Sequence, residues 1–357
     1  MFNILKSFLG TNSILGVDIG TASIKAAEIV QSSPKPRLKN YGILKTYSHL
    51  SRPNSAIQAN SLKIVEDETA KLLAELVKKS NFKTKEAVAS IPSFSSFTTL
   101  IEMPIMSEVD MIKTMPFQIK QHIPLPIEEV AIDWIKIGER EDETGKKQQI
   151  LFISIPKEII IKYQNIFKLA GLKLKALEIE GLALIRSLVA NDPTPTLIVD
   201  IGARSTNIII SDSGFLKLNN FTDFAGASLT QAIANGLGIS TRRAEELKKQ
   251  KGLKTGGADF ELSTLPQPYL DVIIKELIGA KNRYENNYKR KIERVIISGG
   301  GANLIGITEY FENQIGIPTV IGNSFLQVNY PSSIQLVSRE LGPELAVAIG
   351  LGVKNLS

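Results

Sequence analysis

Two segments of the sequence bring together the residue types that bind a phosphate chain and a magnesium ion. In each, an apolar run ends at an aspartate, Asp18 or Asp200, and a glycine turn with small polar residues follows. Glycine lets backbone N–H groups approach a phosphate, and hydroxyls add donors without bulk. A carboxylate beside them can hold the waters of a magnesium ion, so we expect both aspartates to position a metal. The residues expected to clamp phosphates are Gly20, Thr21, Ala22, Ser23 and Lys25 in the first segment and Gly202, Arg204, Ser205 and Thr206 in the second.

These segments belong to a longer internal repeat. The stretch ILGVDIGTASIKAAEI at 14–29 resembles TLIVDIGARSTNIIIS at 196–211, and both contain Val-Asp-Ile-Gly-x-x-Ser. In each copy, two apolar runs around a polar turn predict a β-hairpin. One Asp-Gly turn alone is explained by ordinary hairpin chemistry. The repetition favours two related domains whose hairpin tips face each other and grip one triphosphate.

A third glycine-rich segment, SGGGAN, lies between an apolar run and a predicted helix. The backbone of Gly299, Gly300 and Gly301, with Asn303 beside it, can approach a base or a phosphate closely. Such a run alone is equally typical of a tight turn. The order of the three glycine sites along the chain favours a ligand.

The elements that must position these turns are predicted from hydrophobic periodicity. The expected helices span 65–79, 107–122, 157–170, 228–237, 241–251 and 269–290, and the expected strands between the repeats include 130–137 and 149–155. The polar stretch GEREDETGKK is predicted as the turn that joins those two strands. Gly171 is predicted to end the helix before it. The region from about 84 to 172 therefore predicts a small α/β subdomain.

Composition excludes several classes of protein. The chain has 357 residues, which favours two or more domains. It has no cysteine and only two histidines, so disulfides, iron–sulfur clusters, thiol catalysis and a histidine metal cluster are not expected. A net charge of +6 favours acidic partners only weakly. The opening residues contain no apolar run of signal-peptide length, and we expect a cytosolic protein.

The motifs together resemble those of the actin-like ATPase superfamily. VDIGTASIK, VDIGARSTN and SGGGAN are similar to its phosphate 1, phosphate 2 and adenosine motifs, and LEIEGLALIRSL and LGPELAVAIGLGV to its two connecting helices, all in the same order. The resemblance implies an α/β fold of two duplicated domains with ribonuclease H-like sheets and an FtsA-type 1C subdomain insert. The implied subdomains are 1A (13–83, 173–194 and 335–357), 1C (84–172), 2A (195–238 and 292–334) and 2B (239–291).

A narrower resemblance is to the PilM family of type IV pilus assembly proteins. FQIKQHIPLPIEEVAIDW, AGLKLKALEIEGLALIRSL and DFAGASLTQAIANGLGISTRRAEELKK are similar to segments of that family. It implies ATP and Mg²⁺ between the two halves, with Glu245 and Lys248 near the ribose or adenine, although an ordinary solvated helix also explains these two charges. Glu180 is the implied catalytic residue that orients the attacking water. Because Gly181 is an alternative for that position, we expect slow or conditional hydrolysis.

The family resemblance also implies partners. These are the N-terminal cytoplasmic peptide of a PilN-like inner-membrane protein, bound in a groove of subdomains 1A and 1C, and other inner-membrane pilus assembly proteins. The chain would then lie at the inner face of the cell membrane through its partner. Self-association stays open. Ile123, Leu125 and Ile127 are candidates for the groove, with core packing as the alternative. A membrane-surface anchor would be formed by Phe2, Leu5, Lys6, Phe8 and Leu9, with docking of this segment on the protein itself as the alternative.

Four other functions are compatible with parts of the sequence. An FtsA-like division scaffold is expected to continue past the last core helix, near Val353, to an amphipathic anchor, and a GspL-like protein to carry a transmembrane helix. A small-molecule kinase of the same superfamily needs a catalytic base, and no acidic motif in 84–172 is suited to that role. Nucleic-acid binding would depend on KNRYENNYKRKIER, whose glutamates and helical period favour a solvated helix instead. We therefore expect no nucleic-acid partner.

Overall fold

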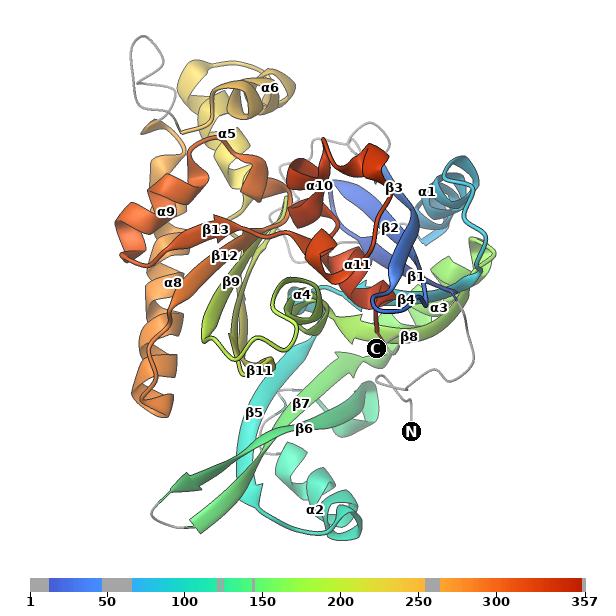
Figure 1. The fold of residues 1–357 in the computed structure, drawn as a ribbon, viewed down its shortest axis with the longest axis vertical. Coiled ribbons are helices and arrows are strands. Elements are labelled where there is room, and N and C mark those ends of the chain that lie inside the picture. Colours follow the sequence, from blue (N-terminus) through green and yellow to red (C-terminus); the bar gives the residue numbers. More distant parts are fainter. Residues whose placement is uncertain are drawn as a thin grey trace.

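The computed structural model describes residues 13–46, 66–120, 123, 125–142, 145–253 and 264–354. Two five-stranded sheets and a third, three-stranded sheet form the framework (Figure 1). The α/β architecture expected from the sequence is confirmed.

The first five-stranded sheet contains the first repeat. Its strands are β1 (Ser13–Ile19), β2 (Ser23–Val30), β3 (Arg37–Lys45), β4 (Glu86–Ile91) and β8 (Lys173–Ile179), in the order β3-β2-β1-β4-β8. β1 pairs antiparallel with β2 and parallel with β4. The hairpin and the parallel strands therefore bring the polar tip to the carboxyl end of β1, where Asp18 stands.

The second five-stranded sheet repeats this topology. Its strands are β9 (Thr196–Ile201), β10 (Thr206–Asp212), β11 (Phe215–Thr222), β12 (Arg294–Ser298) and β13 (Thr319–Ile321), in the order β11-β10-β9-β12-β13. β9 pairs antiparallel with β10 and parallel with β12, as β1 does with β2 and β4. The domain duplication predicted from the repeat is therefore present in the fold, and Asp200 is equivalent to Asp18.

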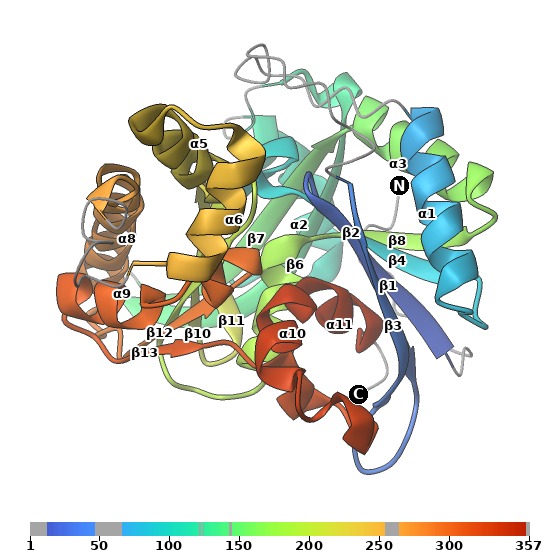
Figure 2. The same cartoon turned by 90° about the horizontal axis from the view of Figure 1, so that it is seen from above.

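Helices cover both faces of the sheets, which explains why the central strands are nearly continuous apolar runs. In Figure 2, α1 and α3 lie on one side of the first sheet and α11 on the other. The helices are α1 (Glu66–Lys79), α2 (Glu108–Lys120), α3 (Lys157–Leu169), α4 (Glu180–Leu188), α5 (Gly226–Leu237), α6 (Thr241–Lys251), α8 (Gln267–Tyr288), α9 (Ile307–Ile315), α10 (Ser338–Glu344) and α11 (Ala346–Gly352). Within the described ranges, none of the helices has the length and apolar character needed to cross a bilayer.

The six helices expected from hydrophobic periodicity agree with the structure to within two residues at each end that the structure describes. Gly171 follows α3 with a φ of +73°, as expected of a glycine that ends a helix. α8 ends before the expected Arg290, because Lys289 adopts a left-handed conformation with a φ of 55°. His122, at the expected end of the helix 107–122, lies outside the described residues.

The connecting helix before the second repeat is shorter than predicted. The segment LEIEGLALIRSL was expected to be helical throughout, but Leu177–Ile179 belong to β8 and pair with β4. α4 begins at Glu180. The reason is the parallel partner strand, which supplies the backbone hydrogen bonds that a helix would otherwise make.

The third sheet, which we call the insert sheet, contains β5 (Phe97–Pro104), β7 (Gly145–Pro156) and β6 (Val130–Asp142), in that spatial order. The stretch GEREDETGKK, predicted as a turn, is mostly paired strand. Glu139 lies opposite Gln148, Arg140 opposite Lys147 and Glu141 opposite Lys146. Cross-strand pairing therefore extends the hairpin into a polar segment. This segment lacks the alternating apolar residues from which a strand is predicted.

The insert sheet is smaller than the expected subdomain 84–172. β4 pairs with β1 in the first sheet, and Tyr163, Ile166 and Phe167 of α3 are buried in the core of that domain. Similarly, α8 was expected in subdomain 2B, but Leu270, Ile273, Leu277 and Tyr284 are buried in the core of the second sheet. The subdomain boundaries remain predictions.

Helix α11 crosses the first sheet and α4 at very close range. A Cβ added to Gly350 of α11 would overlap the carbonyl oxygen of Ala183 in α4, and one added to Gly16 of β1 would overlap that of Ala348. The guanidinium of Arg186, from α4, also donates a hydrogen bond of 2.7 Å to the carbonyl oxygen of Gly350. The position of the last helix thus depends on the absence of side chains at these crossings.

We expect Gly350→Ala to lower the free energy of unfolding by about 3 kcal/mol, because two packed backbones must separate. Gly279→Ala in α8 is the matched control. Its new methyl group would meet only the guanidinium of Arg283, at 3.7 Å, and alanine favours the helix by about 1 kcal/mol. Chemical denaturation measures both changes. Equal stability of the Gly350 variant and the wild type would contradict this account of the crossing.

Candidate nucleotide-binding site

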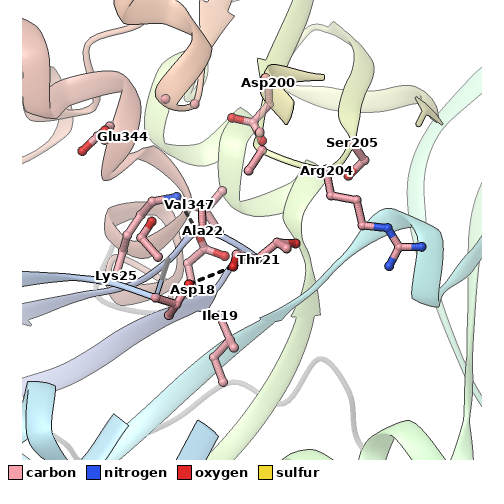
Figure 3. A pocket seen from close by; sticks show the side chains of 18 of the residues that line it. Asp18, Ile19, Thr21, Ala22, Lys25, Asp200, Arg204, Ser205, Glu344 and Val347 are labelled. Atoms are coloured by element: carbon pink, nitrogen blue, oxygen red, sulfur yellow. Dashed lines mark hydrogen bonds and ion pairs between the residues drawn. The ribbon is translucent and has the colours of Figure 1, made fainter. Parts of the chain in front are cut away.

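A cleft of about 450 Å³ lies between the two repeated domains. Every site residue expected from the sequence lines this cleft except Thr206. Both hairpin tips, the glycine run and the start of α4 therefore converge on one cavity, as the repeat had suggested. Figure 3 shows residues of both repeats around it.

The two hairpin tips have the same backbone turn. The N–H of Gly20 donates to the carbonyl oxygen of Ser23 at 3.0 Å, and the N–H of Gly202 donates to that of Ser205, also at 3.0 Å. A Cβ at either glycine would crowd the same carbonyl oxygen. The chain thus builds two equivalent turns, one from each domain.

Thr206 differs from the other expected residues. It is fully buried at the start of β10, and its hydroxyl donates to the carbonyl oxygen of Phe224 at 2.7 Å. It helps to fix the hairpin and does not line the cleft.

Asp18 forms an ion pair with Lys25 across the first hairpin. Lys25 Nζ lies 3.1 Å from Asp18 Oδ2 (Figure 3). The hydroxyl of Ser90 donates to Asp18 Oδ1 at 3.0 Å. Burial alone would lower the pKa of Lys25, but the carboxylates of Asp18, Asp200 and Glu344 raise it above its usual value. Lys25 is therefore a largely buried cation surrounded by acids.

Asp200, Glu180 and Asn207 form the opposite wall. Asn207 Nδ2 donates to Glu180 Oε2 at 2.7 Å and lies 3.4 Å from Asp200 Oδ2. Burial raises the pKa of Asp200 to about 6; Lys25 opposes this rise and Asp18 adds to it. Burial, together with repulsion from Asp18 and Asp200, raises the pKa of Glu180 to about 8. Burial therefore makes both carboxyls at this wall costly to ionise in the free protein.

These residues fit a hydrated magnesium ion better than a metal held by protein alone. Within the described part of the chain, no group of three or more His, Cys, Asp or Glu side chains could hold a metal. The buried Asn207 Oδ1 has no hydrogen-bond partner, so it is free to accept from a metal-bound water. Two carboxylates, one amide oxygen and space for water match the preference of magnesium for oxygen ligands and retained waters.

The expected ribose or adenine side of the cleft has its own ion pair. Lys248 Nζ lies 2.6 Å from Glu245 Oε2 and donates to the carbonyl oxygen of Gly226 at 2.9 Å. Burial would raise the pKa of Glu245, but Lys248 outweighs it and the pKa falls to about 2. The pair is therefore charged at neutral pH and presents hydrogen-bonding groups to the cavity.

The glycine run closes the same side. Gly299 has a φ of +76° that favours glycine, and its N–H donates to the carbonyl oxygen of Pro343 at 3.1 Å. Asn303 Nδ2 donates to the carbonyl oxygen of Glu340 at 3.0 Å. The glycine run is thus a tight turn that also lines the cleft. Both interpretations of the sequence, a structural turn and a segment close to a ligand, are compatible with this position.

Several residues of the site were missed by sequence reasoning. They are Phe94, Tyr163, Asn207, Gly226 and Glu344. The repeat itself could have revealed Asn207, because it follows Asp200 at the same distance at which Lys25 follows Asp18. The others lie outside the repeated segments 14–29 and 196–211.

The residues considered for protein or membrane contacts lie away from this cleft or outside the described residues. Ile123 packs against the small core of the insert sheet, Leu125 is 43% exposed and Ile127 is half-buried. The segment 2–9, considered as a membrane anchor, lies outside the described residues.

Comparison with known proteins agrees with this geometry. A family model described as type IV pilus assembly protein PilM matches residues 16–356. The structure of a PilM-PilN type IV pilus biogenesis complex is similar, with a TM-score of 0.81 and 22% identity over 96% of this chain and 98% of that chain. MreB 5 of Spiroplasma citri bound to AMPPNP has a TM-score of 0.52 and 16% identity over 96% of this chain and 95% of that chain. These likenesses confirm the predicted actin-like fold.

A curated relative gives a shorter match. Cell division protein FtsA of Bacillus subtilis (strain 168) is 25% identical over 146 residues, which are 37% of this chain and 33% of that protein. The chain thus matches about a third of the length of this relative.

The raised pKa of Glu180 predicts a pH-dependent stability. The folded state holds this proton more tightly than the unfolded state, so the free energy of unfolding should fall as the pH rises from about 4.5 to about 8. Glu180→Gln removes the charge, and we expect it to be more stable than the wild type by about 1–2 kcal/mol at pH 8 and by less at pH 5. Denaturation at several pH values measures this, with the exposed Glu158→Gln as control. Parallel pH profiles of Glu180→Gln and wild type would exclude this electrostatic account.

Proposed function

The chain belongs to the family of type IV pilus assembly proteins PilM, and on this basis we propose that it is an ATP-binding platform of pilus assembly that holds the cytoplasmic N-terminal peptide of a PilN-like protein. The observation that carries the nucleotide part is the convergence of two equivalent hairpin tips on one cleft. The proposed location of the protein in the cell is the inner face of the cell membrane. It would be held there by its membrane-bound partner and by other pilus assembly proteins.

Each wall of the cleft has a proposed role. The two hairpin tips would donate backbone N–H and hydroxyl hydrogen bonds to the phosphates, and Lys25 would balance their charge. Asp18 and Asp200 would hold the waters of Mg²⁺, which would supply positive charge against the phosphate oxygens. Glu245 and Lys248, with the glycine run opposite, would hold the ribose and base.

The electrostatics of Glu180 support slow or conditional hydrolysis. With a pKa of about 8, most of this carboxyl is protonated at pH 7. A protonated carboxyl is a poor acceptor for the proton of an attacking water. Asn207, which donates to Glu180 at 2.7 Å, would hold the carboxyl at the cleft wall. Bound ATP would therefore be hydrolysed only slowly.

Exposed apolar side chains on the insert support a protein partner. Val109 is 62% exposed, Ile112 46% and Phe117 75%, all on α2 beside the insert sheet. Clustered exposed apolar side chains are typical of protein contact surfaces. The similar solved structure is a PilM-PilN complex, so a PilN-like peptide is the proposed occupant.

The basic segment 281–294, which includes the end of α8, gives no support to nucleic-acid binding. Lys281 and Lys291 pair with Glu285, Arg290 pairs with Asp212, and Arg294 pairs with Asp192. Its tyrosines Tyr284 and Tyr288 stack on each other at 5.0 Å. These side chains are engaged within the protein, so they offer few free cations or rings to a nucleic acid.

The nucleotide proposal is tested by calorimetric titration with Mg-ATP. Asp200→Asn keeps the size of the side chain and removes its charge, and we expect it to raise the Kd for ATP by about 10-fold or more in the presence of magnesium, with a smaller effect in EDTA. Asp18→Ala should act in the same direction. The exposed Asp223→Asn, outside the cleft, serves as control. Unchanged Mg-ATP affinity in both variants would remove these aspartates from the metal site.

The partner proposal is tested by titration with a peptide from the cytoplasmic start of the neighbouring PilN-like protein, with and without Mg-ATP. We expect saturable binding with a Kd of about 1–10 μM. A scrambled peptide of the same composition controls for non-specific contact. No binding in either state would leave the nucleotide cleft standing and would favour an FtsA-like scaffold, the relative that shares part of this sequence.

A further inference from the structure

The side chain of Arg204 does not take part in the charge network of the cleft. Its backbone belongs to the second hairpin tip, yet its Cζ lies 4.5 Å from the centroid of the Phe94 ring in the first domain. In Figure 3 the side chain points away from Asp18 and Lys25. Among the residues that the structure describes, no carboxylate pairs with it. Arg204 is therefore a cation at a phosphate-binding turn, held in place by an aromatic ring.

Phe94 belongs to a short 3₁₀ turn, Ser93–Ser95, that connects β4 to β5. Phe94 and Ser95 of this turn line the cleft. The Phe94 ring contacts Phe221 of β11 edge to face, with centroids 6.4 Å apart. Two residues after the turn, β5 begins the insert sheet. This one turn thus contacts the cleft and the second domain and leads directly into the insert.

Polar contacts hold the insert sheet against the second domain. Arg140 Nη2 donates to the carbonyl oxygen of Asn287 at 2.8 Å, and Gln149 Nε2 donates to the hydroxyl of Tyr288 at 3.4 Å. Lys217 Nζ donates to Gln149 Oε1 at 2.7 Å, and Asn219 Nδ2 donates to Thr98 Oγ1 at 3.3 Å. Asn219 Oδ1 and the hydroxyl of Ser93 are buried without a hydrogen-bond partner. Buried unsatisfied groups cost free energy, so this arrangement of the turn and the insert can give way to one in which they are paired.

We propose that the contact between Arg204 and Phe94 is a phosphate-responsive switch that couples the cleft to the insert sheet. The proposal rests on the proposed binding of ATP. A guanidinium forms stronger, bidentate hydrogen bonds with a phosphate than it forms with an exposed ring. The terminal phosphate of ATP therefore draws Arg204 away from Phe94. The released turn changes the position of β5, and with it the insert.

Linkage gives the switch a measurable consequence. Breaking the contact costs free energy that ATP binding must supply, whereas ADP lacks the terminal phosphate and leaves the contact in place. Weakening the ring contact should therefore tighten ATP binding relative to ADP binding. The coupling is reciprocal. A partner that prefers the released insert would raise the affinity for ATP by the same factor by which ATP raises the affinity for that partner.

The sequence supplies a natural reporter. Trp134 is the only tryptophan, and it lies on β6 opposite Phe152, packed against the core of the insert sheet. Its fluorescence emission can be followed while the full chain is titrated with Mg-ATP or Mg-ADP. We expect ATP to change the emission and ADP to leave it close to that of the free protein.

Two variants separate the contact from nucleotide binding itself. Phe94→Leu removes the ring and keeps an apolar side chain, and it should bind ATP about 2–5-fold more tightly, the factor that corresponds to an exposed cation–π contact. Because Phe94 also lines the cleft, the decisive quantity is the ratio of ATP affinity to ADP affinity, which should rise by this factor. Arg204→Lys keeps the charge and loses the planar fork, so ATP should bind more weakly and the emission change should shrink. Phe215→Leu, on β11 and 45% exposed, is the matched control for loss of a phenyl ring.

Calorimetry and fluorescence on the same samples distinguish the failures. If ATP binds but ATP and ADP give the same Trp134 emission, or if Phe94→Leu leaves the ratio of ATP affinity to ADP affinity unchanged, the switch is excluded and the proposed function stands. If calorimetry detects no ATP binding to the wild type, the proposed function and the switch both fail. A thermal melt of each variant confirms that it is folded before its affinities are compared.

Discussion

The ion pair between Lys25 and Asp18 lies where the two halves of the molecule meet. Lys25 is largely buried and faces Asp18, Asp200 and Glu344, so it is the cation that allows several carboxylates to share one cleft. Burial still raises the pKa values of Asp200 and Glu180, to about 6 and about 8. Carboxyls that are costly to ionise, beside the unsatisfied amide oxygen of Asn207, are suited to receive a cation together with its anionic ligand.

The duplicated topology creates this cleft. In each domain a hairpin precedes parallel strands, so each polar tip stands at the carboxyl end of its central strand. α4 and α11 pack closely between the sheets, with backbone approaches that only glycine permits. These crossings hold α11 against α4 and the first sheet, and α4 in turn contacts β10 and β11 of the second sheet.

The insert sheet is joined to the second domain in a different way. Its own core is apolar, around Ile150, Phe152 and Met115, but its contacts with β11 include isolated hydrogen bonds and ring contacts. Polar contacts of this kind contribute about 1 kcal/mol each, much less than a buried apolar layer. The insert sheet is therefore anchored to the first domain, where Leu151, Ile153 and Ile155 are buried in the core, whereas its contacts with the second domain are polar and aromatic.

The sequence by itself determined the repeat, the two Asp-Gly turns, the glycine run and most of the helices, because these depend on local backbone preference and on periodicity. All but one of the residues that the sequence assigned to the nucleotide site line the cleft. The exception is Thr206, whose buried hydroxyl donates to the carbonyl oxygen of Phe224. Only the tertiary structure decided that Leu177–Ile179 is strand, that GEREDETGKK is paired and that Asn207 joins Glu180 to Asp200. The placement of Arg204 on Phe94 belongs with these. The strand Leu177–Ile179, the bond from Asn207 to Glu180 and the contact of Arg204 with Phe94 depend on partners far away in the chain, whereas the GEREDETGKK hairpin is local and lacks only an apolar pattern. A backbone or side chain takes its final hydrogen bonds and charges from the groups that the fold places beside it.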